Sequence, residues 1–145
     1  MSVARTAAVA VLALGLAGCT ESRPYANLPE KNLQVRTATD GGRVVLEVHS
    51  LDGSCTTSYE GFVALDKPLV EVGLPSGKPA VLVFDFQKAG RGTEAPIRKE
   101  VHLLPRAGNR YEARVAYKES IYDIELRELD PRTGTDREID TRRRC

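Results

Sequence analysis

The stretch PAVLVFDFQ, residues 79–87, has the two-residue period of a β-strand. One face carries only apolar side chains, namely Ala80, Leu82, Phe84 and Phe86. The other face carries Val81 and Val83 before it becomes polar at Asp85 and Gln87. A strand with apolar residues on both faces is covered on both sides. We therefore expect residues 79–87 to form a central strand.

The same period recurs on both sides of this stretch. Further strands are expected over residues 33–39, 43–50, 61–65, 68–74, 97–104, 110–117 and 121–129, with a short last segment over 137–140. Residues 97–104 also fit one face of a helix, and we favour a strand because the neighbouring segments are strands. About eight strands separated by Gly and Pro turns predict an all-β protein. We favour an antiparallel β-sandwich over a barrel.

The chain opens with a different kind of segment. Arg5 precedes an apolar run over residues 7–17. This run is too short to cross a membrane, because a spanning helix needs about 20 apolar residues. A positive charge, a short apolar run and small residues are typical of a secretory signal peptide. The alternative is a buried N-terminal helix.

The end of that run, LAGC at residues 16–19, resembles the lipobox of bacterial lipoproteins. The resemblance implies that residues 1–18 are a lipoprotein signal peptide and that Cys19 carries a diacylglycerol and becomes the new N-terminus. More than one acyl chain, such as palmitate, would then anchor the protein stably to membrane lipid. Thr20, in place of an aspartate, implies the outer membrane of a Gram-negative cell, with the domain in the periplasm.

Residues 19–32 are expected to form a lipidated flexible tether. The stretch TESRPYANLPEKN is polar, contains Pro24 and Pro29, and shows neither the helix nor the strand period. A flexible chain of this length has a root-mean-square reach of roughly 20 Å and an extended limit of about 40 Å. The remaining residues, 33–145, suffice for one β-sandwich domain with its own core.

The charge balance excludes one class of partner. Without Arg5, the chain keeps 20 of its 21 Lys and Arg residues against 20 Asp and Glu residues, so its formal net charge is zero. Nucleic-acid binding needs a clustered basic face, so we expect no nucleic-acid partner. The one dense positive run is Arg142, Arg143 and Arg144. It could contact an acidic partner or anionic lipid, or it could be a solvated tail.

Two cysteines remain once Cys19 is assigned to the lipid. Cys55 lies in the polar segment LDGSCTTSYEG, residues 51–61, and Cys145 ends the chain in TRRRC. Exported proteins meet an oxidising compartment in which cysteines pair. We expect a Cys55–Cys145 disulfide, which would close a loop of about 90 residues and contribute roughly 4 kcal/mol. Two reduced thiols, or pairing between two chains, are the alternatives.

The sequence contains no recognisable catalytic or metal-binding pattern. His49 and His102 alternate with apolar residues, so each is expected to be a surface or half-buried strand residue. A metal site made of both histidines and Cys55 lacks every characteristic spacing. Carboxylates on the 121–129 strand are expected to form ion pairs on an exposed face, namely Asp123, Glu125 and Glu128. We expect no enzymatic activity, no metal and no cofactor.

Two stretches carry a second resemblance. VEVGLPSGKPAVLVFDF at residues 70–86 and AGNRYEARV at residues 107–115 are similar to the immunoglobulin-like or transthyretin-like sandwich domains of bacterial lipoproteins. The resemblance supports the fold and implies no activity. We expect a lipid-anchored, non-enzymatic binding or structural module of the cell envelope with an envelope protein as partner. The alternatives are a secretion-system accessory lipoprotein of the transthyretin-like type and a periplasmic inhibitor or immunity protein.

Overall fold

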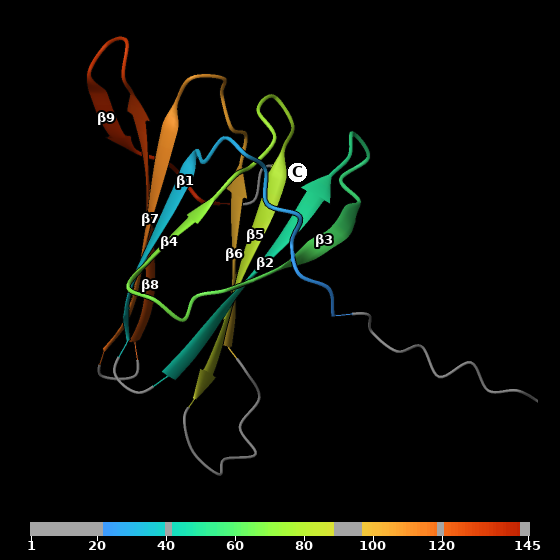
Figure 1. Ribbon diagram of the computed structural model, residues 1–145, viewed down its shortest axis with the longest axis vertical. Coiled ribbons are helices and arrows are strands. Elements are labelled where there is room, and N and C mark those ends of the chain that lie inside the picture. The colour runs from blue at the N-terminus through green and yellow to red at the C-terminus, as the bar shows by residue number, and fades with distance from the viewer. Residues whose placement is uncertain (1–21, 40–41, 89–96, 119–120, 143–145) are drawn as a thin grey trace, which may run out of the picture.

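The computed structural model describes residues 22–39, 42–88, 97–118 and 121–142. Within these ranges the protein is all-β, with nine strands and no helix. The strands are β1 (Leu33–Thr39), β2 (Gly42–Leu51), β3 (Thr57–Ala64), β4 (Leu69–Val72), β5 (Ala80–Lys88), β6 (Ile97–Leu103), β7 (Arg110–Lys118), β8 (Ile121–Asp130) and β9 (Thr135–Glu138). Figure 1 shows them as two facing layers. The predicted β-sandwich is confirmed, and the ambiguous stretch after residue 96 is a strand, β6.

The strands divide into two sheets. One sheet has the order β4-β1-β7-β8-β9 and the other has the order β3-β2-β5-β6. Neighbouring strands are antiparallel except for β1 and β7, which run parallel from the pair Leu33–Tyr111 onwards. In an immunoglobulin sandwich the first, second, fourth and fifth strands share a sheet. Here β1 and β2 lie in different sheets, so the strand order is not the immunoglobulin one.

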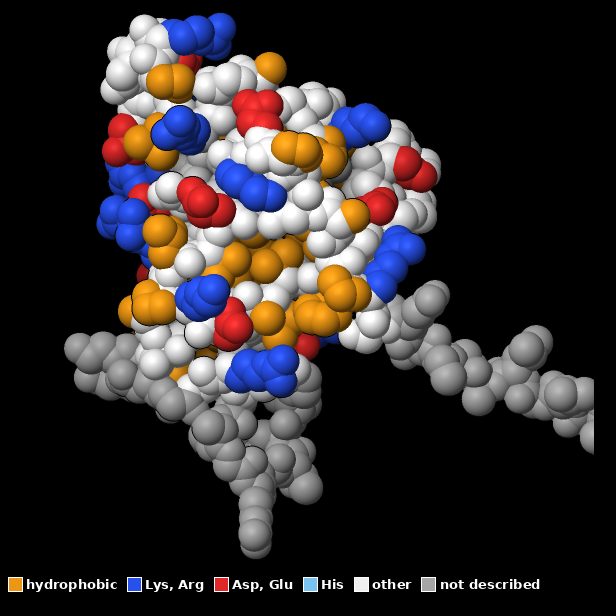
Figure 2. Space-filling model, viewed as in Figure 1, with side chains coloured by type: hydrophobic (Ala, Val, Ile, Leu, Met, Phe, Trp, Pro, Cys, Tyr) orange, Lys and Arg blue, Asp and Glu red, His pale blue; other side chains and the backbone are white. Residues whose placement is uncertain are grey.

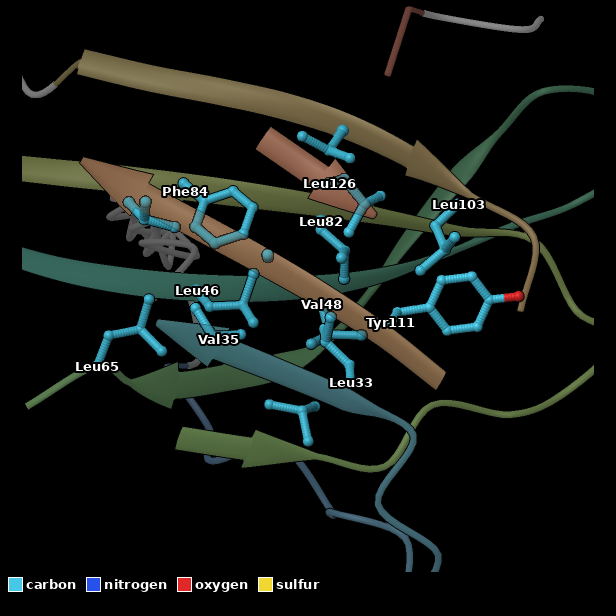
Figure 3. Close-up of a cluster of buried hydrophobic side chains, with 14 of the residues drawn as sticks. Leu33, Val35, Leu46, Val48, Leu65, Leu82, Phe84, Leu103, Tyr111 and Leu126 are labelled. Carbon is cyan, nitrogen blue, oxygen red and sulfur yellow. The ribbon is translucent and has the colours of Figure 1, made fainter. Parts of the chain in front are cut away.

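The hydrophobic core lies between the two sheets. β5 has β2 on one side and β6 on the other, so it is an interior strand, as its two apolar faces predict. Its Leu82 and Phe84 are fully buried and pack in one cluster with residues of the other sheet, among them Val35 and Leu126. Figure 3 shows Tyr111 at one end of this cluster, with its hydroxyl directed away from the labelled aliphatic side chains.

Two predictions about polar strand residues are wrong. Glu128 was expected on an exposed face, but it is buried, with 4% of its surface exposed. It is in phase with buried Leu126 on β8, so alternation turns both side chains inward. His102 was expected at the surface or half-buried, and it is buried, with 8% of its surface exposed. Both residues lie near the end of their strands, where the sandwich closes.

The N-terminal segment differs from the predicted flexible tether. Residues 22–32, which we call the strap, lie along the domain instead of standing off it (Figure 1). Tyr25 N donates to Phe62 O at 2.9 Å and Phe62 N donates to Arg23 O at 3.0 Å, so the strap pairs with β3. These contacts use mainly backbone groups, which leave no apolar period in the sequence. Cys19 and the predicted signal peptide over residues 1–18 lie outside the described residues.

Candidate functional site

One end of the sandwich contains a cavity of about 470 Å³, which we call the strand-end cavity. The end of β2, the start of β5 and the end of β6 meet there with the start of β7, the end of β8 and the segment after β9. Its apolar lining consists of Leu51, Pro79, Ala80, Leu103, Leu104 and Ile139. Its polar lining includes Asp52, His102, Arg106, Tyr111, Glu128 and Arg137. This volume lies within the range of small-molecule sites.

The Glu128 carboxylate is the centre of a hydrogen-bond cluster on one wall of the cavity. Its Oε1 accepts from Asn109 Nδ2 and from the Tyr111 hydroxyl, each at 2.9 Å. Its Oε2 accepts from Arg137 Nε at 2.8 Å and from a second nitrogen of the same guanidinium. Arg106 Nε lies 3.8 Å from Oε1. A buried charge is stable only with such partners, and this cluster joins β8 to β7 and β9.

These contacts set the ionisation of the cluster. Burial alone would raise the pKa of Glu128, but hydrogen bonds from Asn109, Arg137 and Tyr111 outweigh it and hold the pKa below its usual range. Burial, followed by a smaller effect of the nearby carboxylate, raises the pKa of Tyr111. Glu128 is therefore an ionised acceptor at neutral pH. A general acid or base needs a pKa near the working pH, so Glu128 does not fit that role.

His102, near the end of β6, is another lining residue of the cavity. Both of its ring nitrogens are buried, and neither makes a hydrogen bond within the described part of the chain. Each neutral imidazole has one N–H donor and one acceptor nitrogen. Buried polar groups in native proteins are nearly always hydrogen-bonded, and an exception calls for an explanation. Asn109 Oδ1 is likewise buried without a hydrogen bond in the described part of the chain. Because the His102 nitrogens have almost no accessible surface, they are not exposed to the cavity.

The loop before β3 closes the cavity at Cys55. Asp52 Oδ1 accepts from Ser54 N, Ser54 Oγ and Thr56 N at 2.7–2.9 Å, and these bonds, with the Ser54 hydroxyl first, lower the pKa of Asp52. Cys55 has a φ of 65°, which is uncommon for a residue other than glycine. Cys55 is disulfide-bonded. Cys145, its predicted partner, lies outside the described residues, so the pairing stays a prediction.

The strap is the second candidate region. The Asn32 side chain is buried and exchanges two hydrogen bonds of 2.8 Å with the backbone of Leu74. Gly73 N donates to Asn27 Oδ1 at 2.6 Å. A Cβ at Gly61 would lie 2.5 Å from Tyr25 Cα, and a Cβ at Gly73 would lie 2.5 Å from a strap carbonyl. Glycine at these positions is what allows the strap to approach the sheets.

The strap contacts were not predicted from the sequence, although a signal was present. A glycine inside a strand often marks a close approach of another backbone. Gly61 lies inside β3, and Gly73 directly follows β4. The signal for Glu128 was its phase with Leu126 on the same strand. His102 lacked such a signal, because the adjacent Val101 and Leu103 face the core on either side of it.

The remaining predicted site residues do not come together. His49 Nε2 lies 3.1 Å from Glu47 Oε2, and the His49 ring makes an edge contact with Tyr59. Among the described residues, no group of three or more His, Cys, Asp or Glu side chains could hold a metal ion. Arg142 makes hydrogen bonds to Asp140 at 2.7–3.1 Å. Arg143 and Arg144 lie outside the described residues, so a contact of this run with an acidic partner stays a prediction.

The surface carries both signs of charge. On the outer face of the five-stranded sheet, Glu112 pairs with Arg114 Nε at 2.7 Å and with Arg36 Nε at 3.3 Å. The Arg114 hydrogen bond is the main reason that the pKa of Glu112 lies below its usual range. Figure 2 shows blue and red side chains interspersed, with a group of hydrophobic side chains in the middle of the viewed face. In the described ranges, no helix is long and apolar enough to cross a membrane.

Comparison with known proteins adds no assignment. No family model matches the chain, and no curated protein matches it.

Proposed function

We propose that this protein is a lipid-anchored, non-enzymatic binding module of the cell envelope, attached through Cys19 to the outer membrane with its domain in the periplasm. The observation that carries the proposal is the strap. Its hydrogen bonds to β3 begin at Arg23, only four residues after the lipobox cysteine. A lipid on Cys19 would therefore hold a folded domain, not the end of a long flexible chain.

The strap sets how far the domain can stand from the lipid. Four Cα–Cα steps separate Cys19 from Arg23, the first residue held to β3, and they span at most about 15 Å. The predicted tether would have allowed about 40 Å. Because the strap enters beside β3, the β3 side of the sandwich would face the lipid surface. The strand-end cavity lies at the end of the strands and would remain open to the periplasm.

The buried ionisable groups support a binding role over a catalytic one. The lone pairs of Glu128 are occupied by hydrogen bonds from Asn109, Tyr111 and Arg137. Its pKa is low, so it would not accept a proton near neutral pH. These contacts stabilise the end of the sandwich and leave the cavity walls fixed.

Cys19→Ser is the test of anchoring. Cells expressing the full chain are fed a labelled fatty acid, and the protein is then followed through membrane fractionation. We expect wild type to be labelled and membrane-bound, and Cys19→Ser to be unlabelled and either released or unprocessed. Cys145→Ser is the matched control, and it should keep the label. Equal labelling of wild type and Cys19→Ser would contradict the proposal.

A second candidate comes from the resemblance of residues 70–86 and 107–115 to transthyretin-like domains of bacterial lipoproteins. The secretion-system accessory lipoprotein is therefore the alternative. Crosslinking in intact cells, followed by identification of the captured proteins, separates the two. Capture of secretion-machine components would favour the alternative, and capture of another envelope protein would favour the first proposal.

A further inference from the structure

We propose that the strap occupies a peptide-binding site, which we call the strap groove, and that an extended segment of a partner protein can replace the strap there. The strap groove consists of the backbone of residues 59–62 in β3 and of residues 71–74 at the end of β4 and directly after it. The proposal deepens the proposed binding role, because it names the surface and the kind of partner. It does not depend on a lipid at Cys19.

The domain offers mainly backbone groups to the strap. β3 and β4 are edge strands of the two sheets, and the strap lies against both of them (Figure 1). Both backbone groups of Phe62 pair with the strap. The Tyr25 hydroxyl donates to Gly73 O at 2.9 Å, and Asn27 Nδ2 donates to Glu71 O at 3.2 Å. In strand addition, backbone groups at a sheet edge bind an extended segment, and side-chain pockets select it. The strap groove provides the backbone groups for such binding.

The strap is held by few contacts. Of residues 22–32, all except Tyr25 and Asn32 are exposed. The strap pairs with β3 through one isolated bridge, Pro24–Phe62, and not through a ladder. Segments with few buried apolar contacts and with exposed hydrogen bonds open at a low free energy. The strap can therefore leave the groove while the two sheets stay folded.

The strap also leaves space beside it. A cavity of about 380 Å³, which we call the strap cavity, lies between the strap and the domain. Its apolar lining consists of Tyr25, Ala26, Val48, Pro75, Pro79 and Ala80. Val48 and Ala80 are buried, so the cavity reaches the edge of the core. Glu60 and Lys78 add one charge of each sign, so the lining favours an uncharged side chain. A larger apolar side chain in place of Ala26 would remove more of this surface from water.

These features define the partner segment. It would carry an aromatic residue in place of Tyr25, whose ring packs against the core, then a larger apolar residue, then an asparagine in place of Asn27. Asn27 bonds both Gly73 N and Glu71 O. Replacement of the strap would turn residues 20–32 into a tether with an extended limit of about 40 Å. Binding of the partner would then let an anchored domain stand further from the lipid.

A synthetic peptide with the sequence of residues 22–32 is the probe. The receptor is the purified full chain with Tyr25→Ala and Asn27→Ala, which weaken the hold of the strap and leave the backbone groups of the groove in place. We expect the labelled peptide to bind this double variant about tenfold or more tighter than wild type, measured by fluorescence polarisation. The reason is that the strap of wild type competes at a high effective concentration. A scrambled peptide of the same composition should bind neither protein.

Two further changes in the double variant locate the site. Gly73→Ala would place a Cβ 2.5 Å from a strap carbonyl and should abolish binding of the peptide. Gly53→Ala is the matched control, because nothing lies within 4 Å of a Cβ at that position, and it should leave the affinity unchanged. Thermal unfolding shows whether each variant is folded. Independently of these variants, a peptide with Ala26→Leu should bind about fivefold more tightly, because the larger side chain fills the strap cavity.

Four outcomes would overturn the proposal. They are no binding of the peptide to the folded double variant, equal binding of the scrambled peptide, unchanged affinity in folded Gly73→Ala, and an Ala26→Leu peptide that binds no more tightly than the strap sequence. Fatty-acid labelling of Cys19→Ser is a separate measurement. A failure of anchoring and a failure of peptide binding are therefore distinguishable.

Discussion

Glu128 and His102 are both buried at the same end of the sandwich, but within the described residues only Glu128 makes side-chain hydrogen bonds. On the wall from β7, β8 and β9, every oxygen of Glu128 accepts hydrogen bonds, and Tyr111 both donates and accepts. On β6, neither ring nitrogen of His102 has a hydrogen-bond partner in the part of the chain that the structure describes. A buried polar group stabilises a fold only when its bonds are made. The Glu128 cluster therefore supports the fold, whereas the His102 ring adds no hydrogen bond to it within the described residues.

The largest expected effect comes from removing the charge at Glu128. Glu128→Gln keeps the shape of the side chain but removes the carboxylate that Arg137 binds. It also places an amide N–H group where the neighbouring groups are hydrogen-bond donors. We expect the free energy of unfolding to fall by about 3 kcal/mol, measured by urea denaturation. Glu125→Gln is the control, because Glu125 pairs with Arg127 at a half-exposed position, and it should cost less than about 1 kcal/mol. Equal losses of unfolding free energy in Glu128→Gln and Glu125→Gln would mean that the buried carboxylate contributes no more to stability than the half-exposed one.

Tyr111→Phe tests the same wall with a smaller change. It removes a hydroxyl that donates to Glu128 at 2.9 Å and accepts from Arg106 N at 2.8 Å. We expect a loss of about 1.5 kcal/mol by thermal or urea unfolding. Tyr25→Phe removes a single bond, from a half-buried hydroxyl to Gly73 O, and should cost less. A larger loss of unfolding free energy for Tyr25→Phe than for Tyr111→Phe would contradict the prediction that the two hydrogen bonds of the Tyr111 hydroxyl matter more.

His102→Phe should have the opposite sign. It replaces a ring with two unbonded nitrogens by an apolar ring of similar shape, so we expect unfolding free energy to rise by up to about 1 kcal/mol. His49→Phe is the matched control, because it removes the contact with Glu47 and should not stabilise. A clear loss of stability in His102→Phe would show that the two ring nitrogens do contribute to the folded state.

The dependence of stability on pH also tests the contribution of Glu128. Because the folded state lowers the pKa of Glu128, its contribution is present above the unfolded pKa, about 4.3, and is lost as pH falls through the folded value. Wild type should therefore lose more stability than Glu128→Gln when the pH is lowered from 7 to about 3. Urea denaturation at several pH values measures the difference. Parallel curves for the two proteins would contradict it.

Much of the fold could be predicted from the sequence because it rests on alternation. The two apolar faces of residues 79–87 indicated an interior strand, and β5 is one. The strand assignment for residues 97–104 rested on weaker grounds, because three apolar positions fit either period, and β6 confirms it. Pairing between β1 and β7 could not be predicted, since it joins residues about 80 positions apart without a local signal.

The polar parts of the molecule were harder to predict for a physical reason. The strap is held by backbone groups and by Asn27 and Asn32, and such contacts do not produce a hydrophobic period. Glu128 was assigned to the exposed face by its charge, although its phase with Leu126 indicated the interior. The cavity itself arises where five strand ends and the segment after β9 meet, and only the three-dimensional arrangement brings them together.

The pairing of the strap with β3 also bears on self-association. β3 is an edge strand of the four-stranded sheet, and an open edge can template pairing with another chain. The strap bonds both backbone groups of Phe62, so this part of the edge is already occupied. If Cys19 is lipidated as proposed, neighbouring copies would meet at high local concentration on one membrane surface. The strap would then keep this edge from pairing, and proteolytic removal of the strap would expose a strand that can pair with another chain.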